Sequence, residues 1–402
     1  MRFGFAVDRI DERIPGIDLP LMSVSQTRGV IRRSELTDKP HRADSLDVYK
    51  VCRRDDIVFN KMSIRSGAMG VAKEDGLVTY HYEVMRPREW VDSRFIAYLM
   101  KSHWFTGELI KRERGIGAGG QGNVRTTEVP FSVLKTIDSW IPDADGQRAI
   151  ADFLDQETAQ IDALVAKQLE FIGLLRERHM AEIGAGVEAE LPNSRLRRHV
   201  KTIRQGWSPN AEPFPADGVT EWGILKVGCS TGGKFRPEEN KKLPSEVAPR
   251  HEHVVKLGEI VMSRSNSREL VGSAAVVHQD HPRLMLSDLN YGLMVADSLD
   301  PNFAVYALMT RRARAELASR AKGTSPSMQK LAQRDVLDFP LWVPTIDEQR
   351  AITDHLDAQT HRIDTLIAKA EEHIALAKER RAALITAAVT GQFDVRTARK
   401  AG

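Results

Sequence analysis

Two long stretches of the chain alternate apolar and polar residues in the rhythm of an α-helix. In residues 141–187 the apolar side chains recur at alternating steps of three and four positions, and mostly charged or amide side chains fill the remaining places. This spacing gathers the apolar residues on one face of a helix, close to the heptad pattern of a coiled coil. We therefore predict a helix of about 40 residues, roughly 60 Å long at 1.5 Å per residue, which a compact domain of this size does not need for its own packing.

The same stretch occurs again as residues 343–389. At a fixed offset of 202 positions, the two copies match without a gap at 24 of 47 residues. This period is too long for a solenoid, whose repeats span about 20 to 50 residues, and indicates a duplicated half. Either each helix packs on its own half of the chain, or the two helices form an antiparallel pair. The residues expected in the coiled-coil seam or in a subunit interface are Ile150, Leu154, Ile161, Leu164, Ile352, Leu356, Ile363 and Leu366.

Both copies carry residues that commonly start and stop helices. Proline precedes each helix, an aspartate follows as the expected N-cap, and a glycine near the far end is the expected stop. In chain order these residues are Pro142, Asp145 and Gly184 in the first copy and Pro344, Asp347 and Gly391 in the second.

The two regions outside the repeats favour short strands followed by one helix. The expected strands are residues 19–24, 47–51, 57–60 and 77–84 in the first region and 224–227, 259–263 and 273–277 in the second. The helices are expected at residues 93–114 and 302–321. Two local matches indicate common descent, because residues 56–61 resemble 259–264 and residues 92–95 resemble 300–303.

A glycine-rich segment ends the first of these helices and fits G-x-G-x-x-G from Gly117 to Gly122. A dinucleotide or methyl-donor site requires a strand before such glycines and a helix after them. Here a helix comes first and a polar, extended segment follows. We interpret the segment as a loop whose bare backbone can approach a partner closely.

Composition narrows the classes of protein. The 402 residues are 42% apolar and 28% charged, as in globular chains of several domains. The two cysteines, Cys52 and Cys229, are far apart, which favours a reducing compartment over a disulfide framework. No apolar run has the length of a signal or a membrane span, so we expect a cytoplasmic protein that contacts no membrane. The net charge of +3 excludes a general polycation, so a nucleic-acid surface requires local clusters of basic residues.

Basic residues do cluster in the two unique regions, beside serine, threonine, asparagine and glycine. Such mixtures serve phosphate and base-edge contacts, although a single cluster is more often a solvated face. Clusters at equivalent places in both halves favour the binding interpretation. The candidate DNA-binding residues are Asn60, Lys61, Arg65, Arg112, Lys234, Arg236, Ser263, Arg264, Asn266, Arg268, Lys322, Thr324 and Ser325.

The motifs of enzymes are missing from the sequence. Base methylation needs a cofactor loop after a strand and an Asp/Asn-Pro-Pro-aromatic segment, and ATP-driven translocation needs G-x-x-x-x-G-K-[ST]; the chain has neither. His251 with His253, and His278 with His281, lack cysteine or a third spaced ligand and are interpreted as surface residues rather than metal ligands. We predict a non-catalytic protein without a cofactor or metal of its own.

These features carry a family resemblance over essentially the whole chain. Each long helix opens with P-x-x-D-x-Q-R-A-I, variable regions precede both helices, and the second helix closes with LITAAVTGQFDV. This layout resembles the DNA-specificity subunit of a type I restriction-modification enzyme. The resemblance implies an α+β fold in which two globular α/β target-recognition domains are separated by two long helices in an antiparallel coiled coil, with internal pseudo-two-fold symmetry. The implied domains are residues 1–140, 141–190 for the central helix, 191–341 and 342–402 for the C-terminal helix.

The resemblance also implies partners and a division of labour. Each recognition domain reads one half of a split, asymmetric sequence in double-stranded DNA. The helices set the distance between the half-sites and dock two DNA methyltransferase subunits. S-adenosylmethionine, ATP and Mg are bound by these and by the restriction or translocase subunits. The alternative of another class is a coiled-coil scaffold whose two heads bind proteins.

Two departures limit what is carried over from the family. The second region has about 30 residues before Leu225-Lys226-Val227, whereas the first has 20 before Leu21-Met22-Ser23, which indicates a shortened or differently started N-terminus. The resemblance makes GTSPSMQKL, from Gly323, the loop that leads back to the second helix, and GIGAGGQGNV, from Gly115, its counterpart. The first loop lacks Gly-Thr-Ser, so DNA contacts are not copied from one half to the other.

Overall fold

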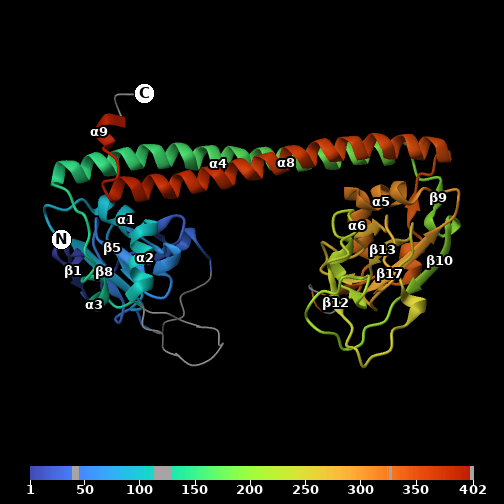
Figure 1. Ribbon diagram of the computed structural model, residues 1–402, viewed down its shortest axis with the longest axis horizontal. Helices are drawn as coiled ribbons and strands as arrows, with labels where there is room; N and C mark the ends of the chain where they lie inside the picture. Colours follow the sequence, from blue (N-terminus) through green and yellow to red (C-terminus); the bar gives the residue numbers. More distant parts are fainter. Residues whose placement is uncertain (39–44, 113–128, 324, 326–327, 399–402) are drawn as a thin grey trace. The chain divides into compact units, whose positions relative to one another are not determined.

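The computed structural model describes residues 1–38, 45–112, 129–323, 325 and 328–398. The chain forms two compact units (Figure 1). The first combines Met1–Gln168 with Glu371–Gly402, and the second is Leu169–Ala370. Each unit therefore contains one unique region together with parts of both repeats.

A four-stranded antiparallel sheet organises the first unit, in the order β1-β8-β5-β6. Its strands are β1 (Val7–Ile10), β5 (Ile57–Asn60), β6 (Met69–Val71) and β8 (Tyr82–Pro87). Two small sheets pair β2 (Met22–Ser25) with β3 (Gly29–Arg32) and β4 (Lys50–Cys52) with β7 (Gly76–Val78). The expected strand at residues 77–84 was wrong as one element, since a turn in which the Tyr82 amide bonds to the Thr79 carbonyl separates β7 from β8.

The second unit repeats this sheet with the order β10-β17-β13-β15, again antiparallel throughout. Its strands are β10 (Val200–Gln205), β13 (Ile260–Ser263), β15 (Ala274–Val276) and β17 (Asn290–Val295). The smaller sheets join β12 (Asn240–Lys242), β11 (Gly223–Leu225) and β16 (Leu284–Met285); β14 (Ser265–Asn266) and β18 (Gln329–Lys330); and β9 (Ser194–Arg195) and β19 (Pro340–Leu341). The common strand order confirms the relationship that the two local sequence matches predicted.

The first of those matches has a structural basis in ion pairs that each contain a buried carboxylate. Asp56 precedes β5 and accepts two bonds from Arg86, with Oδ1 2.8 Å from Nε and Oδ2 2.9 Å from Nη2. Glu259 precedes β13 and accepts two bonds from Arg204, at 2.7 and 2.6 Å. Both carboxylates are buried, so their charge requires the bidentate partner that each one has.

Each unit carries a broken helix where one continuous helix was expected. In the first unit, α1 (Ser93–Lys101) and α2 (His103–Arg112) meet at Ser102, whose hydroxyl bonds to the Leu99 carbonyl and accepts from the Phe105 amide. In the second, α5 (Pro301–Met309) and α6 (Arg311–Arg320) meet at Thr310, whose hydroxyl accepts from the Ala313 amide. A hydroxyl that caps a new helix competes with helix continuation, which is why the predicted single helices were wrong.

The two long helices are α4 (Ala144–Val187) and α8 (Ile346–Val389), each of 44 residues. The short helices are α3 (Phe131–Leu134), α7 (Gln333–Leu337) and α9 (Val395–Ala398). The expected caps were wrong by two residues: Asp143 accepts from the Gly146 amide, and Thr345 and Glu348 form reciprocal bonds around the start of α8. The expected stop at Gly184 was also wrong, because α4 continues to the buried Val187, whereas Gly391 does follow α8 with φ +72°.

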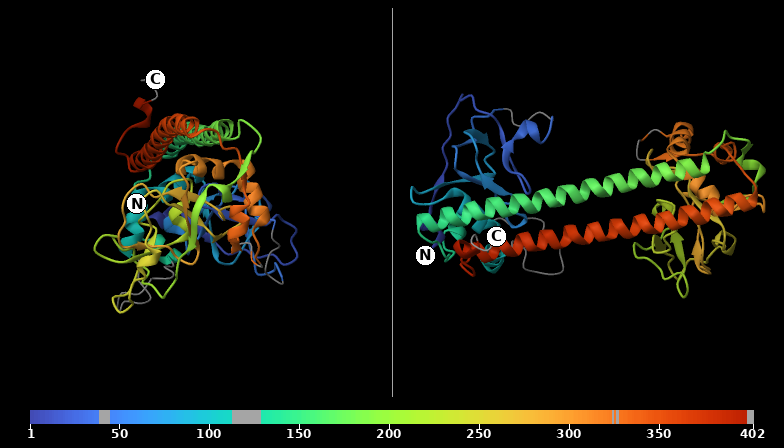
Figure 2. Two further views of the ribbon diagram at one scale, coloured as in Figure 1. Left: turned by 90° about the vertical axis from the view of Figure 1, so that its right-hand side faces the viewer. Right: turned by 90° about the horizontal axis from the view of Figure 1, so that it is seen from above.

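Within each unit, α4 and α8 run side by side in opposite directions (Figure 2). In the first unit, Asp162 pairs with Arg381 at 3.0 Å, and the Phe153 ring lies 5.6 Å from that of Phe393. In the second, His179 bonds to Thr360 at 2.9 Å. The antiparallel pair is therefore confirmed, and so is the α+β fold class.

Each hydrophobic core joins a sheet and its helices to the start of one long helix and the end of the other. The first core includes Phe3, Phe59, Phe95, Ile150, Leu154, Ile385 and Val389. The second includes Ile260, Leu293, Phe303, Ile183, Val187 and Leu356. In the described part of the chain, no helix is both long enough and apolar enough to cross a membrane.

Candidate nucleic-acid interface

Four of the basic candidates, Lys61, Arg65, Arg264 and Arg268, lie on equivalent strand connections in the two units. In the first unit, β5 leads to β6 through a short 3-10 helix, η3 (Ile64–Ser66), and through Gly67 at φ +77°. In the second, β13 leads to β15 through β14 and Gly272 at φ +78°. The positive φ values favour glycine and allow each connection to turn back sharply. Arg65 and Arg268 are both exposed on these connections.

The second connection is extended by a neighbouring segment. Ser265 and Asn266 of β14 pair with Lys330 and Gln329 of β18, and the Leu331 amide bonds to the Arg264 carbonyl at 3.0 Å. We call this two-stranded element, with the flanking residues Arg264–Arg268 and the described residues 322, 323, 325 and 328–331, the β14–β18 ribbon. It brings together six of the sequence candidates: Arg264, Asn266, Arg268, Lys322, Ser325 and the adjoining Ser263. Thr324 lies outside the described residues.

Side chains at the base of the ribbon are held in place by the sheet. Arg264 Nε donates to the Tyr291 hydroxyl at 3.1 Å, and its Nη1 donates to the Asp288 carbonyl at 3.2 Å. Tyr291 in turn donates to the Leu331 carbonyl at 2.9 Å. Ser263 is fully buried and accepts from Asn266, so its contacts here are internal.

The outer part of the ribbon is basic and exposed. Arg268, Lys322 and Lys330 are exposed, and so is the apolar Met328. Lys330 was not among the sequence candidates, although it lies in the GTSPSMQKL segment. The pairing of β18 with β14 places Lys330 next to the other basic residues of the ribbon.

The first unit places its candidates more sparsely. The Asn60 side chain accepts from the Met62 amide at 3.0 Å and so shapes the turn after β5. Lys61 lies 3.9 Å from the buried Glu83, and Arg112 at the end of α2 pairs with Glu108. The GIGAGGQGNV loop that follows lies outside the described residues.

Two other candidates of the second unit line a cavity beside the long helices. Lys234 forms an ion pair with Asp364 of α8, and Arg236 donates to the Thr231 carbonyl. The cavity has a volume of about 930 Å³ and lies between the long helices and the globular part of the second unit. We call the globular part of each unit its head. Among the described residues, no group of three or more His, Cys, Asp or Glu side chains is arranged to hold a metal.

The QRAI motif of each repeat attaches the unique region to the long helix. Gln147 is fully buried; its amide oxygen accepts from the Asp92 N–H at 2.9 Å, and its amide nitrogen donates to the Pro142 carbonyl at 2.9 Å. Gln349 does the same with Asp300 at 2.8 Å and Pro344 at 2.8 Å. Asp92 and Asp300 are the N-caps of α1 and α5, which explains why the second local match contains them. The sequence repeat pointed to these glutamines but did not reveal their partners.

The predicted seam residues divide into two groups. Ile150, Leu154, Ile161, Leu356 and Ile363 are buried, and Ile352 is partly buried. Leu164 and Leu366, at equivalent positions in the two repeats, are 49% and 43% exposed. Leu174 and Leu376, a second pair at equivalent positions in the two repeats, are exposed as well. These four leucines therefore form apolar surface on the helices.

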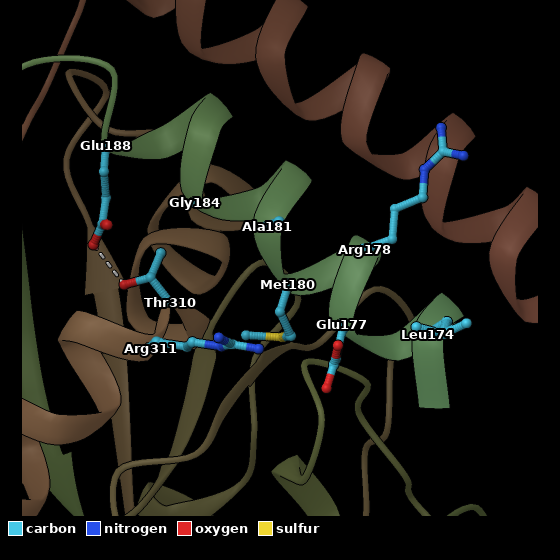
Figure 3. Close-up of a pocket in the computed structure, with 9 residues that line it drawn as sticks. All are labelled: Leu174, Glu177, Arg178, Met180, Ala181, Gly184, Glu188, Thr310 and Arg311. Atoms are coloured by element: carbon cyan, nitrogen blue, oxygen red, sulfur yellow. Dashed lines mark hydrogen bonds between the residues drawn. The ribbon is translucent and has the colours of Figure 1, made fainter. Parts of the chain in front are cut away.

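A shallow depression of about 520 Å³ lies where α4 meets the α5–α6 corner (Figure 3). It is lined from α4 by Leu174, Glu177, Arg178, Met180, Ala181 and Gly184, and by Glu188, Thr310 and Arg311. Glu188 accepts from the Thr310 hydroxyl at 2.7 Å and from Arg312 Nε at 3.0 Å. The end of α4 is thus tied directly to the corner of the head.

These observations define a class of protein: two related heads, each with a basic strand connection and each attached in the same way to paired long helices. No family model matches the chain. Its sequence is similar to the type I restriction enzyme EcoEI specificity subunit of Escherichia coli, with 23% identity over 225 residues, which are 55% of this chain and 37% of that protein. It is also similar to the EcoKI specificity subunit of Escherichia coli strain K12, with 21% identity over 300 residues, 70% of this chain and 62% of that protein.

The matched stretches thus span less than two thirds of these curated relatives. Solved structures resemble the chain over a greater length. A chain from a study of complex assembly and conformational transition of the type I R-M system has a TM-score of 0.74 at 18% identity, covering 98% of this chain and 97% of that one. The HsdS subunit from Thermoanaerobacter tengcongensis has a TM-score of 0.51 at 18% identity, with coverage of 98% and 96%. The resemblance to type I specificity subunits is therefore confirmed.

Proposed function

We propose that this chain is the DNA-specificity subunit of a type I restriction-modification complex. The observation that carries the proposal is the duplicated arrangement in which two divergent heads, each with an exposed basic strand connection, are attached identically to a pair of long helices. Similarity to specificity subunits supports it. The chain itself would catalyse no reaction and would act in the cytoplasm.

In this proposal the β14–β18 ribbon reads the half-site of the second head. A two-stranded ribbon fits the major groove of B-DNA, where base edges are distinguishable. Arg268, Lys322 and Lys330 supply phosphate contacts, and the half-buried Asn266 of β14 contacts base edges. In the first head, the connection that carries Lys61 and Arg65 takes this role.

The target is expected to be split and asymmetric. Two related heads in one chain give two half-sites at a separation fixed by the helices, as dimer geometry fixes half-site spacing in simpler DNA-binding proteins. The connections of the two heads differ in sequence and in length. They therefore read different half-sites.

The exposed leucines of each unit, Leu164 and Leu376 in the first and Leu174 and Leu366 in the second, are the proposed docking positions for one DNA methyltransferase subunit per unit. Leu164 with Leu366, and Leu174 with Leu376, are pairs related by the repeat. Equivalent apolar positions suit two copies of one partner. These partners would bind S-adenosylmethionine, and restriction or translocase subunits would bind ATP and Mg.

Genomic methylation mapping in cells that express the chain with its cognate methyltransferase tests the proposal. We expect a split, asymmetric methylated motif that disappears without this chain. Replacing residues 1–140 by the corresponding region of a related chain is expected to change one half of the motif only. If the two proteins co-purify and no motif is methylated, the proposal is wrong and a scaffold with protein-binding heads becomes the better explanation.

A further inference from the structure

A tyrosine in each head forms a directional contact with a long helix. In the second unit, the Tyr306 hydroxyl of α5 donates to Asp357 Oδ1 of α8 at 2.6 Å and lies 3.3 Å from the Thr360 hydroxyl. Thr360 Oγ1 donates to the Leu356 carbonyl at 2.7 Å and lies 2.9 Å from Nε2 of His179 on α4. We call Tyr306, Asp357 and Thr360 the second junction triad.

The first unit contains the same arrangement, which we call the first junction triad. The Tyr98 hydroxyl of α1 donates to Asp155 Oδ1 of α4 at 2.7 Å and lies 3.2 Å from the Thr158 hydroxyl. Thr158 also bonds to a carbonyl one turn back, that of Leu154, at 2.6 Å. Both aspartates and both threonines are among the residues that match between the repeats.

The hydroxyl groups of both triads are neutral donors at physiological pH. Burial raises the pKa of Tyr98 to about 12, and it raises the pKa of Tyr306 as well, with the bond to Asp357 acting in the same direction. Both tyrosines therefore keep the hydroxyl proton at physiological pH. Both bonds to a carboxylate are charge-assisted and depend on direction.

Apolar contacts do not set the orientation of a head in the same way. Phe95 and Phe303 are fully buried beside the long helices, and their contribution depends mainly on the area removed from water. Such contacts tolerate a small rotation of the head. A hydrogen bond between a helix of the head and a carboxylate on the long helix weakens steeply when the donor turns away.

Each triad also sits among further ties between head and helix. In the first unit, Arg94 of α1 donates to Asp155 and to Asp152, both at 2.9 Å. In the second, Lys234 of the head pairs with Asp364 of α8, one turn beyond Thr360. Arg94 binds the aspartate of the first triad and His179 the threonine of the second, so these ties differ between the heads, whereas the bond from tyrosine to aspartate is common to both.

We propose that the two junction triads are positioning elements that fix the orientation of each head on its long helix and thereby the spacer length accepted between the half-sites. This inference rests on the proposed function. In this proposal the residues of the two triads do not contact DNA bases. They act through the angle at which each head presents its strand connection to DNA.

The test uses the complex of the full chain with its cognate methyltransferase and DNA carrying the mapped motif. The spacer has its natural length or is one base pair longer or shorter. The variants are Tyr98→Phe, Tyr306→Phe and Asp357→Asn, which keep side-chain shape. Thr365→Ala is the matched control for Thr360→Ala, because Thr365 is exposed and makes the same bond to a carbonyl one turn back, and among the described residues it shows no hydrogen bond to the head.

We expect the preference for the natural spacer over the altered spacers to fall about tenfold in Tyr98→Phe with Tyr306→Phe, since the loss of one or two charge-assisted bonds has roughly this effect. Discrimination against a base change in either half-site is expected to stay as in the wild type. Thr365→Ala is expected to behave as the wild type. Thr360→Ala is expected to lower the spacer preference less than Tyr306→Phe does, because it keeps the bond from Tyr306 to Asp357.

An unchanged spacer preference in all triad variants overturns the inference. An equal loss of methylation on every spacer, together with lost half-site discrimination, also overturns it, because that pattern is the one expected of a purely structural role. The wild-type complex decides the proposed function separately: if it methylates no split motif, that function fails and the inference falls with it. If the wild type is active and the variants are not selective for spacer, both proposals stand.

Discussion

At the scale of single residues, the repeated glutamine has the clearest physical role. Gln147 and Gln349 belong to the two QRAI motifs, and both side chains are fully buried. Each accepts a hydrogen bond from the backbone of the adjoining globular region. Each satisfies the backbone N–H of an N-cap residue that would otherwise lack a partner. Its amide group therefore couples the start of a long helix to the start of a head helix.

Replacing Gln349 by alanine is expected to destabilise the second unit by about 1 to 3 kcal/mol, the cost of a buried donor left without its partner. The amide hydrogen of Asp300 should then exchange faster with solvent. Gln156→Ala is the matched control, since Gln156 is exposed on α4. Denaturant unfolding together with amide exchange measures both effects, and equal behaviour of the two variants would contradict this role.

The pH dependence of the second unit is expected to come partly from His179. Burial lowers its pKa below 6.5, against the opposing influence of Asp364 and Glu182. The unfolded chain then binds the proton at a higher pH than the folded chain, so stability decreases as the pH falls from 6.5 toward the lowered pKa.

In His179→Gln, which retains a group able to bond to Thr360, the loss of stability between about pH 7.5 and about pH 5.5 is expected to be smaller than in the wild type. Urea unfolding at both pH values measures it. His199, His253 and His281 have lowered pKa values too, for the same reason, and contribute equally to both proteins. A steeper dependence in the variant would show that the sign is wrong.

The salt dependence of DNA binding tests the β14–β18 ribbon. Replacing Arg268 and Lys330 by alanine is expected to reduce the slope of log affinity against log salt by about two, one for each phosphate that the protein no longer neutralises. Lys369→Ala is the control because Lys369 is exposed on α8. A slope that stays unchanged in the ribbon variant, measured by fluorescence anisotropy on the mapped motif, would remove the ribbon from the interface.

At the scale of elements, glycine residues show why α4 is longer than the sequence predicted. Gly173 and Gly184 lie inside α4, and a Cβ at either position meets no atom within 4 Å. Gly391 has φ +72° and packs against Trp140, so it ends α8 in a conformation that other residues rarely adopt. The same residue type thus has opposite roles in one pair of helices.

Alanine at Gly173 or Gly184 is expected to stabilise the protein by about 0.5 to 1 kcal/mol, since alanine loses less backbone entropy in a helix. Alanine at Gly391 is expected to destabilise it. Thermal unfolding of the three variants measures the difference. A loss of stability in both Gly173→Ala and Gly184→Ala would contradict this view of α4.

Most elements could be predicted because their signals are local. The seam of α4 and α8, the strand before Asn60 and the one before Arg264 follow from apolar spacing alone. The break of each head helix at Ser102 or Thr310 could not, because apolar periodicity continues across both positions and only a hydroxyl bond to the backbone separates the halves. Helix starts were misplaced for a similar reason, since Asp143 and Asp145 are equally suitable caps by residue type.

At the scale of the whole molecule, the long helices are the elements shared by both units. α4 contributes residues 144–168 to the first unit and 169–187 to the second, and α8 crosses in the opposite sense. Neither unit is complete without both repeats. The duplication therefore built one fold with two heads rather than two separate halves.

Lengthening both helices is expected to lengthen the DNA spacer. Insertion of seven residues after residue 168 and of seven before residue 371 adds about 10.5 Å to each helix and keeps the apolar faces nearly in register. This corresponds to about three base pairs of DNA at 3.4 Å each. Methylation mapping is expected to show the same two half-sites with a longer spacer, and an unchanged spacer would show that the helices do not set it. Insertion in one helix only is the control, and it is expected to disturb the pairing of α4 with α8.

The duplication, the two long helices, their shared apolar face and the resemblance to specificity subunits follow from the amino-acid sequence alone, because each depends on residue type at a regular spacing. The sequence also locates the basic residues. Which of them meet depends on the tertiary structure: the pairing of β14 with β18 places Lys330 opposite Ser265, and the fold turns Lys234 toward α8. The partners of Gln147 and Gln349 and the two junction triads also came from the fold, since they join residues far apart in the chain, and no local pattern encodes which distant backbone group a side chain will reach.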